Sequence, residues 1–217
     1  LYLDSDGKEL NRLVGSMSVQ KFLGESQKGM SSRGLSALAK RYEAGERSQE
    51  LIFDYLKALE GGYMQKEATK VANQYLASKE PSALEERENW ALFMRYLTDA
   101  NSDAFKYVHS NKSQFYTLYG EQLVDRKIFD VWSASSKRFV VKEGESVEFD
   151  AKGYKNFLKR LKREKVKDAS LITQNANMHN CEMTGDWSGF QKIAEAKIEA
   201  LQGIENVPIH DLYMWGI

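Results

Sequence analysis

Three consecutive stretches between Leu35 and Leu76 carry apolar residues at a helical spacing. In each stretch the apolar residues recur every three or four positions, which places them along one side of an α-helix. Because the apolar side of such a helix must be buried, each stretch requires neighbouring elements to pack against. The members of the three stripes are Leu35, Leu38, Ala39 and Tyr42, then Leu51, Ile52, Tyr55, Leu56 and Leu59, then Ala68, Val71, Ala72, Tyr75 and Leu76.

The turns between these stretches are marked by glycine. Gly45 follows the first stretch and Gly62 the second, and a glycine just past a helix can adopt the left-handed conformation that closes the last turn. The two glycines are 17 residues apart, so two such units make a helix–turn–helix repeat of 34 residues. That length is the period of tetratricopeptide-type (TPR) arrays. The fold is therefore predicted to be mainly α, as a TPR-like array of antiparallel helix pairs.

Helical patterns continue through most of the remaining chain. The turn at Gly185 is similar to the two earlier glycine turns and is interpreted as part of a second, diverged repeat unit. Residues 140–149 differ, because Gly144 interrupts an alternating pattern that suits either a small hairpin or an extended loop. Further helices are predicted from Ser82 to Thr98, from Asp103 to Tyr119 as one bent helix or two short ones, from Glu121 to Phe139, and after the capping residues Asp150 and Asp168.

Residues 1–15 are the clearest β segment. A short apolar strand leads into the turn-forming quartet Asp-Ser-Asp-Gly at positions 4–7 and the chain then returns, so a hairpin is predicted. Ser18 is a suitable N-cap for the helix that follows, which carries Phe22 and Leu23. An isolated two-stranded hairpin is only marginally stable, and its outer edge can pair with another chain. We therefore expect this segment to dock on the first repeat helices through Phe22 and Leu23, to pair with a second molecule or to fray, and docking with some homo-oligomerisation through the hairpin is the favoured outcome.

The N-terminal segment also carries a family resemblance. Residues 1–15, with the sequence LYLDSDGKELNRLVG, and the helix with Phe22-Leu23 resemble the last third of a thioredoxin fold, where a hairpin is followed by a terminal helix over the sheet. The continuation, as far as about Tyr119, is similar to the helical extension of some bacterial thiol–disulfide interchange proteins. The residues that carry this second similarity are Leu38 to Tyr42, Gly45-Glu46-Arg47, Leu51 to Leu59 and Asn89-Trp90.

The resemblance implies two domains: the C-terminal remnant of a thioredoxin-like domain at residues 1–30 and a helical-repeat, TPR-like domain at residues 31–217. It also implies an accessory or partner-binding role for the helices and a periplasmic or otherwise exported location. The family's W-C-x-x-C motif and cis-proline loop would lie upstream of Leu1, so no redox residue is carried over. The lack of an initiator Met before Leu1 is taken to indicate an excised part of a longer protein.

Composition narrows the function classes. Lys plus Arg and Asp plus Glu each number 31, so no global field attracts nucleic acid, and no nucleic-acid partner is expected. The apolar runs are far shorter than the roughly 20 residues of a membrane span, so no membrane insertion is expected. Cys181 is the single cysteine, which excludes an internal disulfide or a C-x-x-C pair within the chain. It is interpreted as a small core residue.

One segment, residues 152–167, is strongly basic, with eight Lys or Arg residues opposed by Glu164 alone. A basic amphipathic helix can bind phosphates or an anionic membrane, but a solvated outer face is the favoured interpretation because the chain is neutral overall. The histidines show no i, i+4 pattern of helical metal sites. Asn175 and His179 lie one turn apart and are instead predicted to form a buried hydrogen-bond pair between helices.

Two function hypotheses remain, and both imply a protein or peptide partner. In the first, the chain is the C-terminal part of a thioredoxin-like thiol–disulfide interchange protein; in the second, it is a non-enzymatic helical-repeat interaction module. Neither requires a catalytic residue, a cofactor or a metal in this chain, and none is predicted. Aromatic residues of the repeat region could line a peptide-binding surface, although core positions are favoured. They are Tyr42, Tyr55, Tyr63, Tyr75, Trp90 and Tyr96.

Overall fold

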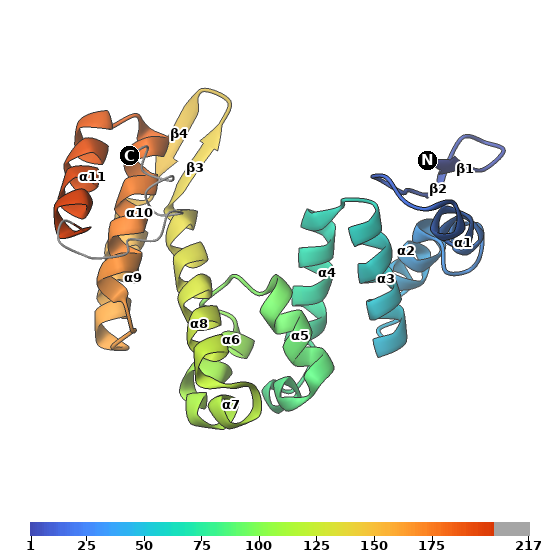
Figure 1. Ribbon diagram of the computed structural model, residues 1–217, viewed down its shortest axis with the longest axis horizontal. Coiled ribbons are helices and arrows are strands. Elements are labelled where there is room, and N and C mark those ends of the chain that lie inside the picture. The colour runs from blue at the N-terminus through green and yellow to red at the C-terminus, as the bar shows by residue number, and fades with distance from the viewer. Residues whose placement is uncertain (202–217) are drawn as a thin grey trace. The chain divides into compact units, whose positions relative to one another are not determined.

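The computed structural model describes residues 1–201, and this part of the chain is mainly helical, as predicted (Figure 1). It contains eleven α-helices, two short 3-10 helices and two β-hairpins. The chain forms two compact units. Unit 1 comprises Leu1–Leu97 and Asn101–Leu118, and unit 2 comprises Thr98–Ala100 and Tyr119–Ile217. The predicted boundary between residues 30 and 31 lies inside unit 1.

Unit 1 begins with a β-hairpin and continues as a series of helices. Helix α3 packs against α2 on one side and α4 on the other, and α4 packs against α5. The elements are β1 (Tyr2–Leu3), β2 (Glu9–Asn11), α1 (Val19–Gly29), α2 (Leu35–Glu43), α3 (Gln49–Gly61), α4 (Gln65–Ala77), the 3-10 helix η1 (Pro81–Glu85), α5 (Arg87–Tyr96), α6 (Asp103–Ser110) and α7 (Lys112–Tyr119).

The predicted apolar stripes form the core of unit 1. Every member of the three stripes is buried except Ala39 and Tyr42, which are half-buried. The core extends to α5 and α7 through Trp90, whose ring stacks on Phe93 with centroids 5.0 Å apart and on Phe115 with centroids 5.2 Å apart. The helix pairs are therefore held by the burial that the sequence requires of them.

The turns after α2 and α3 share one hydrogen-bond pattern. After α2, Gly45 takes φ +95° and donates to the Tyr42 carbonyl, while the next amide donates to the Arg41 carbonyl. This is the Schellman motif, in which a left-handed residue closes the helix. After α3 the same pattern occurs one residue later than predicted, because Gly62 has φ −88° and Tyr63 takes the left-handed conformation with φ +57°.

Tyr63 therefore stores backbone strain that glycine would relieve. Its side chain is 74% exposed, so removing this side chain eliminates few packing contacts. The left-handed conformation costs a residue with a Cβ roughly 1–2 kcal/mol. We expect Tyr63→Gly to raise the free energy of unfolding by up to about 1 kcal/mol, measured by thermal or urea unfolding.

Gly45 supplies the matched comparison. Gly45→Ala should lower the free energy of unfolding by about 1 kcal/mol, because a Cβ at Gly45 meets open space and only the strain at φ +95° remains. A loss of stability in Tyr63→Gly would contradict the strain argument.

Unit 2 is organised around α10, which packs against α8, α9, α11 and the second hairpin. That hairpin forms at residues 140–149, where the sequence left a hairpin or a loop open. Its strands pair in register from Val140 opposite Phe149 to Glu143 opposite Ser146. Gly144 has φ +62° at the first turn position, as a type II′ turn requires. The elements are α8 (Glu121–Ser136), η2 (Lys137–Phe139), β3 (Val140–Glu143), β4 (Ser146–Phe149), α9 (Ala151–Arg163), α10 (Ala169–Thr184) and α11 (Trp187–Leu201).

Aromatic rings fill the space between α8, η2 and α9. Phe157 lies with its ring centroid 5.7 Å from Trp132 and 5.4 Å from Phe139, and all three side chains are buried. The Arg160 guanidinium lies over the Trp132 ring at 4.6 Å from its centroid. One side of α9 is therefore fixed to the core of unit 2.

One predicted helix start was wrong, and one predicted capping side chain makes no cap. The segment after Ser82 begins as η1, and α5 starts only at Arg87, because Glu86 is extended with ψ 136°. The Asn89 amide stabilises this break by donating to the Ala83 carbonyl at 2.9 Å and to the Glu86 carboxylate at 2.9 Å. Asp168 precedes α10 but takes φ +58°, and its side chain makes no capping hydrogen bond.

Candidate protein-docking surface

Helix α1 turns its large apolar side chains outward. The buried residues of α1 are Ser26 and Gly29, whereas Phe22 is 47% and Leu23 55% exposed. Its sequence has the apolar spacing of an amphipathic helix, yet the face that carries this spacing is uncovered. Docking of the segment through Phe22 and Leu23, as predicted from the sequence, is therefore wrong.

The exposed apolar side chains of unit 1 are concentrated in its first 30 residues. Among the described residues of unit 1 beyond that point, only Tyr63 and Leu118 are large, apolar and exposed. Several exposed apolar side chains in one short segment are more informative than single ones, and Val19, Phe22 and Leu23 recur at helical spacing along one side of α1. We call the group the N-terminal apolar surface: Leu1, Leu3, Val14, Val19, Phe22, Leu23 and Met30.

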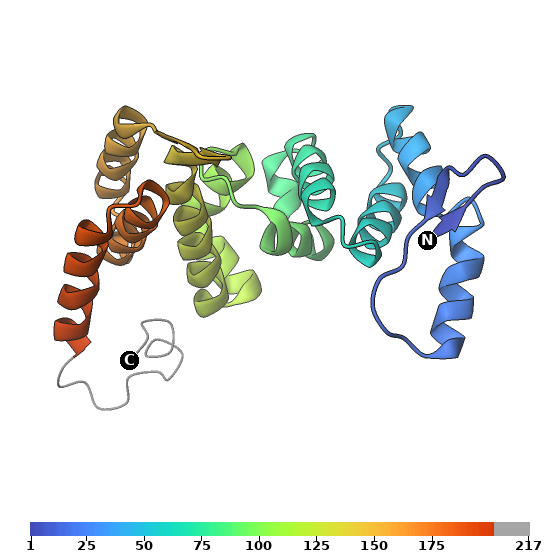
Figure 2. The same cartoon turned by 90° about the horizontal axis from the view of Figure 1, so that it is seen from above.

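The N-terminal hairpin lies next to α1 (Figure 2), and the side chain of Tyr2 joins the two. The Tyr2 ring lies 6.4 Å from the Phe22 ring, and its hydroxyl donates to Ser26 Oγ at 2.5 Å while Ser26 Oγ donates to the Phe22 carbonyl. The sheet formed by β1 and β2 has two strands in the described part of the chain. Each strand therefore keeps one edge without a strand partner, which adds a backbone pairing site to the N-terminal apolar surface.

Asn11, rather than Phe22 or Leu23, connects this segment to the helices. The Asn11 side chain is buried, and its Oδ1 accepts a hydrogen bond from the Leu35 amide at the start of α2. Gly29 permits the close approach, because a Cβ at Gly29 would lie 2.3 Å from Asn11 Nδ2. Gly34 is equally restricted, since its Cβ would lie 2.1 Å from the Gly29 carbonyl oxygen. The sequence contained the residues of this joint but no pattern that predicts it.

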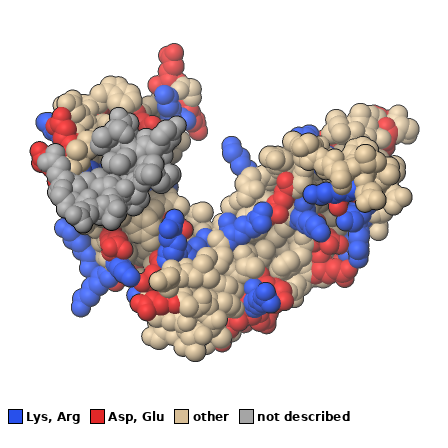
Figure 3. All heavy atoms as spheres, viewed as in Figure 1, with Lys and Arg blue, Asp and Glu red and all other residues tan. Residues whose placement is uncertain are grey.

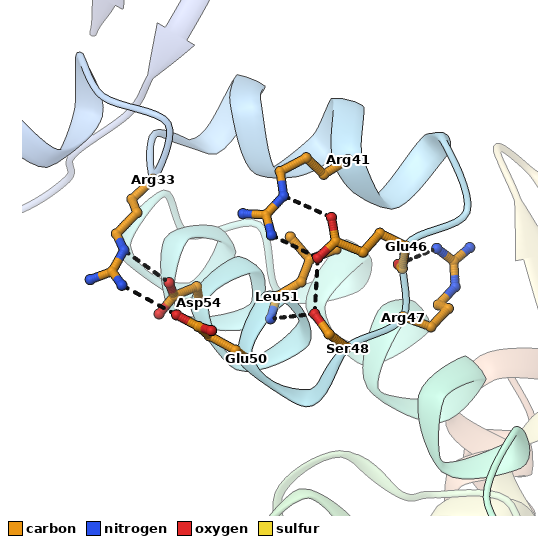
Figure 4. A network of polar contacts seen from close by, with 8 residues as sticks. All are labelled: Arg33, Arg41, Glu46, Arg47, Ser48, Glu50, Leu51 and Asp54. Carbon is orange, nitrogen blue, oxygen red and sulfur yellow. Dashed lines mark hydrogen bonds and ion pairs between the residues drawn. The ribbon is translucent and has the colours of Figure 1, made fainter.

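A polar network fastens the same region to α3 (Figure 4). Arg33 reaches two carboxylates of α3, with 3.3 Å between its Nη2 and Glu50 and 3.5 Å between its Nε and Asp54. Arg41 forms a two-point ion pair with Glu46 in the turn after α2. Exposed ion pairs contribute little free energy, so this network fixes the orientation of the segments more than their stability.

A polar pocket of about 140 Å³ lies between the hairpin, α1 and α3. Its lining includes Arg12, Lys28, Arg33 and Lys57 together with Glu25 and Asp54. Three of these cations are already paired with carboxylates, namely Arg12 with Glu9, Lys28 with Glu25 and Arg33 with Asp54. The pocket is consequently close to neutral and offers no focused field for a charged ligand.

The aromatic residues considered for peptide binding are mostly core residues. Tyr55, Tyr75, Trp90 and Tyr96 are buried. Tyr42 is half-buried, with the Arg47 guanidinium 3.7 Å from its ring centroid and its hydroxyl donating to Gln74 at 2.5 Å. These contacts leave Tyr63 as the accessible member of the set, which does not form a surface.

The predicted pairing of Asn175 with His179 is wrong. Asn175 Oδ1 accepts a hydrogen bond from Lys197 of α11 at 2.7 Å, so its interhelical role involves a different partner. His179 is half-buried, and burial lowers its pKa. Cys181 lies near Asp186, with 3.8 Å between Sγ and Oδ2, and burial together with that carboxylate raises the pKa of the thiol. A thiol with a raised pKa is a poor nucleophile.

Residues 1–201 contain neither a candidate metal-binding cluster nor a helix that could span a membrane. No group of three or more His, Cys, Asp or Glu side chains in this range is placed to hold a metal ion. Within the same range, no helix has the length and apolar character needed to cross a membrane.

Sequence patterns gave no indication of the buried Lys127 in α8. Its side chain is 6% exposed, and burial lowers its pKa to about 8 against the weaker opposing effect of Asp130. The burial of a lysine in the middle of a helix cannot be predicted from the sequence, because it depends on which elements pack against that helix.

The contribution of Lys127 to the stability of unit 2 should therefore rise with pH. Between about 8 and the ordinary lysine value of 10.5, the unfolded chain keeps the proton of Lys127 while the folded chain has lost it. The pKa difference corresponds to about 3 kcal/mol. We expect urea unfolding to show higher stability at pH 10 than at pH 7 through this residue, and Lys127→Met to remove that part of the pH dependence.

Lys192→Met in α11 is the control for this prediction, because Lys192 is exposed. An unchanged pH dependence in Lys127→Met, equal to that of Lys192→Met, would contradict the assignment.

No protein-family model, curated protein or solved structure matches this chain.

Proposed function

We propose that this chain is the C-terminal part of a thioredoxin-like thiol–disulfide interchange protein. In this proposal, β1, β2 and α1 complete a thioredoxin-like sheet, and the helices from α2 onward form an accessory extension that binds a protein or peptide partner. The location would be periplasmic or otherwise exported, as the resemblance implies.

The N-terminal apolar surface is the observation that supports the proposal. A helix that exposes Phe22 and Leu23 while burying Ser26 has the pattern expected when a larger apolar element normally covers its outer face. The free edge of the hairpin, immediately beside it, is suited to a further strand. A sheet that pairs with this edge and packs on α1 would satisfy both requirements together.

A second function, a helical-repeat module that binds a separate protein, is favoured by the repeated Schellman turns. The turns after α2, α3 and α10 share the same hydrogen-bond pattern, with left-handed residues Gly45, Tyr63 and Gly185. The coding sequence upstream of Leu1 distinguishes the two functions. A W-C-x-x-C motif within roughly one domain length, about 100 residues, supports the thioredoxin-like protein, and an upstream sequence without one favours the interaction module.

The N-terminal apolar surface should cause self-association of the 217-residue chain. We expect light scattering to report a mass that rises with concentration, because two copies can cover each other's exposed apolar side chains. Phe22→Ser combined with Leu23→Ser should shift the chain toward the monomer and reduce the fluorescence of a bound hydrophobic dye.

Leu118→Ser combined with Leu123→Ser is the matched control, since both leucines are exposed but lie in α7 and α8. If the control variant reduces association as much as the α1 variant, or if the unmodified chain is strictly monomeric, the N-terminal apolar surface is not the interface.

The chain by itself should not turn over disulfide substrates. Thioredoxin-type reduction needs one thiolate to attack and a second thiol to resolve the mixed disulfide. Cys181 is the single cysteine of the sequence, and the pKa of its thiol is raised. We expect no catalytic reduction of insulin disulfides in the presence of dithiothreitol, and no difference between the unmodified chain and Cys181→Ser. Turnover that is lost in Cys181→Ser would contradict this expectation.

A further inference from the structure

We propose that the exposed face of α9 is a docking surface for an acidic segment of a partner protein. The surface consists of four lysines, Lys152, Lys155, Lys159 and Lys162, which we call the lysine stripe. It lies in unit 2 and is independent of the N-terminal apolar surface.

The fold holds the lysine stripe in one orientation. The apolar side of α9, with Tyr154, Phe157 and Leu161, is buried in the core of unit 2. The four lysines recur at steps of three, four and three residues and are all exposed, so they follow the opposite side of the helix. Over ten residues the stripe is about 15 Å long. Lys and Arg side chains project from the surface of the molecule in the region of α9 (Figure 3).

The stripe is uncompensated, unlike Arg160, Arg163 and Lys167 nearby. Arg160 pairs with Glu164 at 2.7 Å, and Lys167 pairs with Asp125 at 2.7 Å. For the four stripe lysines, no carboxylate of the described chain lies within ion-pair distance. Like charges one turn apart destabilise a helix by a few tenths of a kcal/mol per pair. A row of carboxylates from outside the unit would convert this repulsion into attraction.

The charges that flank the stripe favour a narrow partner. Glu148 and Asp150 precede α9, and Glu164 follows it, so carboxylates stand at both ends. A broad anionic surface, such as a bilayer or a duplex, would meet these carboxylates along with the lysines. A single peptide segment is narrow enough to lie along the lysines without covering the strand that carries Glu148.

The composition of the face argues against lipid and nucleic acid. Its apolar side chains are committed to the core, so α9 cannot insert them among lipid chains. The aromatic residues of α9, Tyr154 and Phe157, are buried, so no ring is available for stacking on bases. The arginine beside the stripe, Arg163, lies 3.5 Å from the Glu164 carboxylate, so its guanidinium already has an anionic neighbour. Lysine point charges at helical spacing fit a helix with Glu or Asp at every third or fourth position.

The test uses a fluorescein-labelled peptide of about 14 residues with Glu at every third or fourth position, titrated with the full chain. Fluorescence anisotropy should report binding that weakens as ionic strength rises from about 0.05 M to about 0.3 M. The same peptide with Gln in place of Glu should not bind. Lys155→Gln combined with Lys159→Gln should weaken binding about three- to tenfold, from the loss of two exposed charge pairs.

Lys66→Gln combined with Lys70→Gln is the matched control. These two lysines are exposed, four residues apart on α4, and carry no ion pair with another described residue, so the change in net charge and spacing is the same. The control variant should bind the peptide like the unmodified chain. Equal weakening in both variants, or no binding of the Glu peptide at low salt, overturns the proposal. Tighter binding of phosphatidylserine vesicles or of single-stranded oligothymidylate than of the Glu peptide overturns it as well.

Discussion

A helix of ten to sixteen residues is marginal in water and becomes stable when a neighbour covers its apolar side. In unit 1 this cover is supplied in series, and α3 receives it from both α2 and α4. Its five stripe residues are almost fully buried as a result. Each such side chain contributes about 1.5–3 kcal/mol, whereas the ion pairs of Arg33 and Arg41 are exposed and contribute far less. Burial of the apolar stripes therefore supplies most of the stability, and the ion pairs of Arg33 and Arg41 mainly fix the relative orientation of the packed helices.

Helix α1 belongs to the same unit, but no neighbouring helix of the described chain covers its apolar side. Its small and polar residues face the hairpin at the joint, where Ser26 bonds to Tyr2 and a Cβ at Gly29 would clash with the Asn11 side chain. The large residues are consequently left on the outside. A loosely packed helix could shift to bury its apolar face. Helix α1 cannot shift in this way within unit 1, because burying Phe22 and Leu23 would require breaking the joint.

Features set by the spacing of neighbouring residues could be predicted from the sequence, whereas features set by contacts between distant segments could not. The stripes of α2 to α4 follow from residue spacing and were predicted, whereas the hairpin at residues 140–149 is one of the two alternatives that the spacing left open. The left-handed residue after α3 was misplaced by one position, because two adjacent glycines leave the helix end undetermined and Tyr63 accepts the strain. Phe22 and Leu23 were correctly placed on an apolar face, but spacing alone cannot say whether a neighbour reaches that face. The same limitation concealed Lys127, whose burial depends on elements distant in sequence.

Equal numbers of acidic and basic residues conceal an uneven distribution of charge. Unit 2 holds Lys127 inside its core and the lysine stripe outside it, and the two positions have opposite consequences. Burial makes the Lys127 charge costly, so this residue acts on stability and its pKa falls. Exposure keeps the stripe charged and hydrated, so its lysines add little to folding and remain available to carboxylates from outside the unit. Net charge describes the field far from the molecule, where the two signs cancel. At contact distance the local row of like charges decides what can bind, and for α9 that row is positive along one side only.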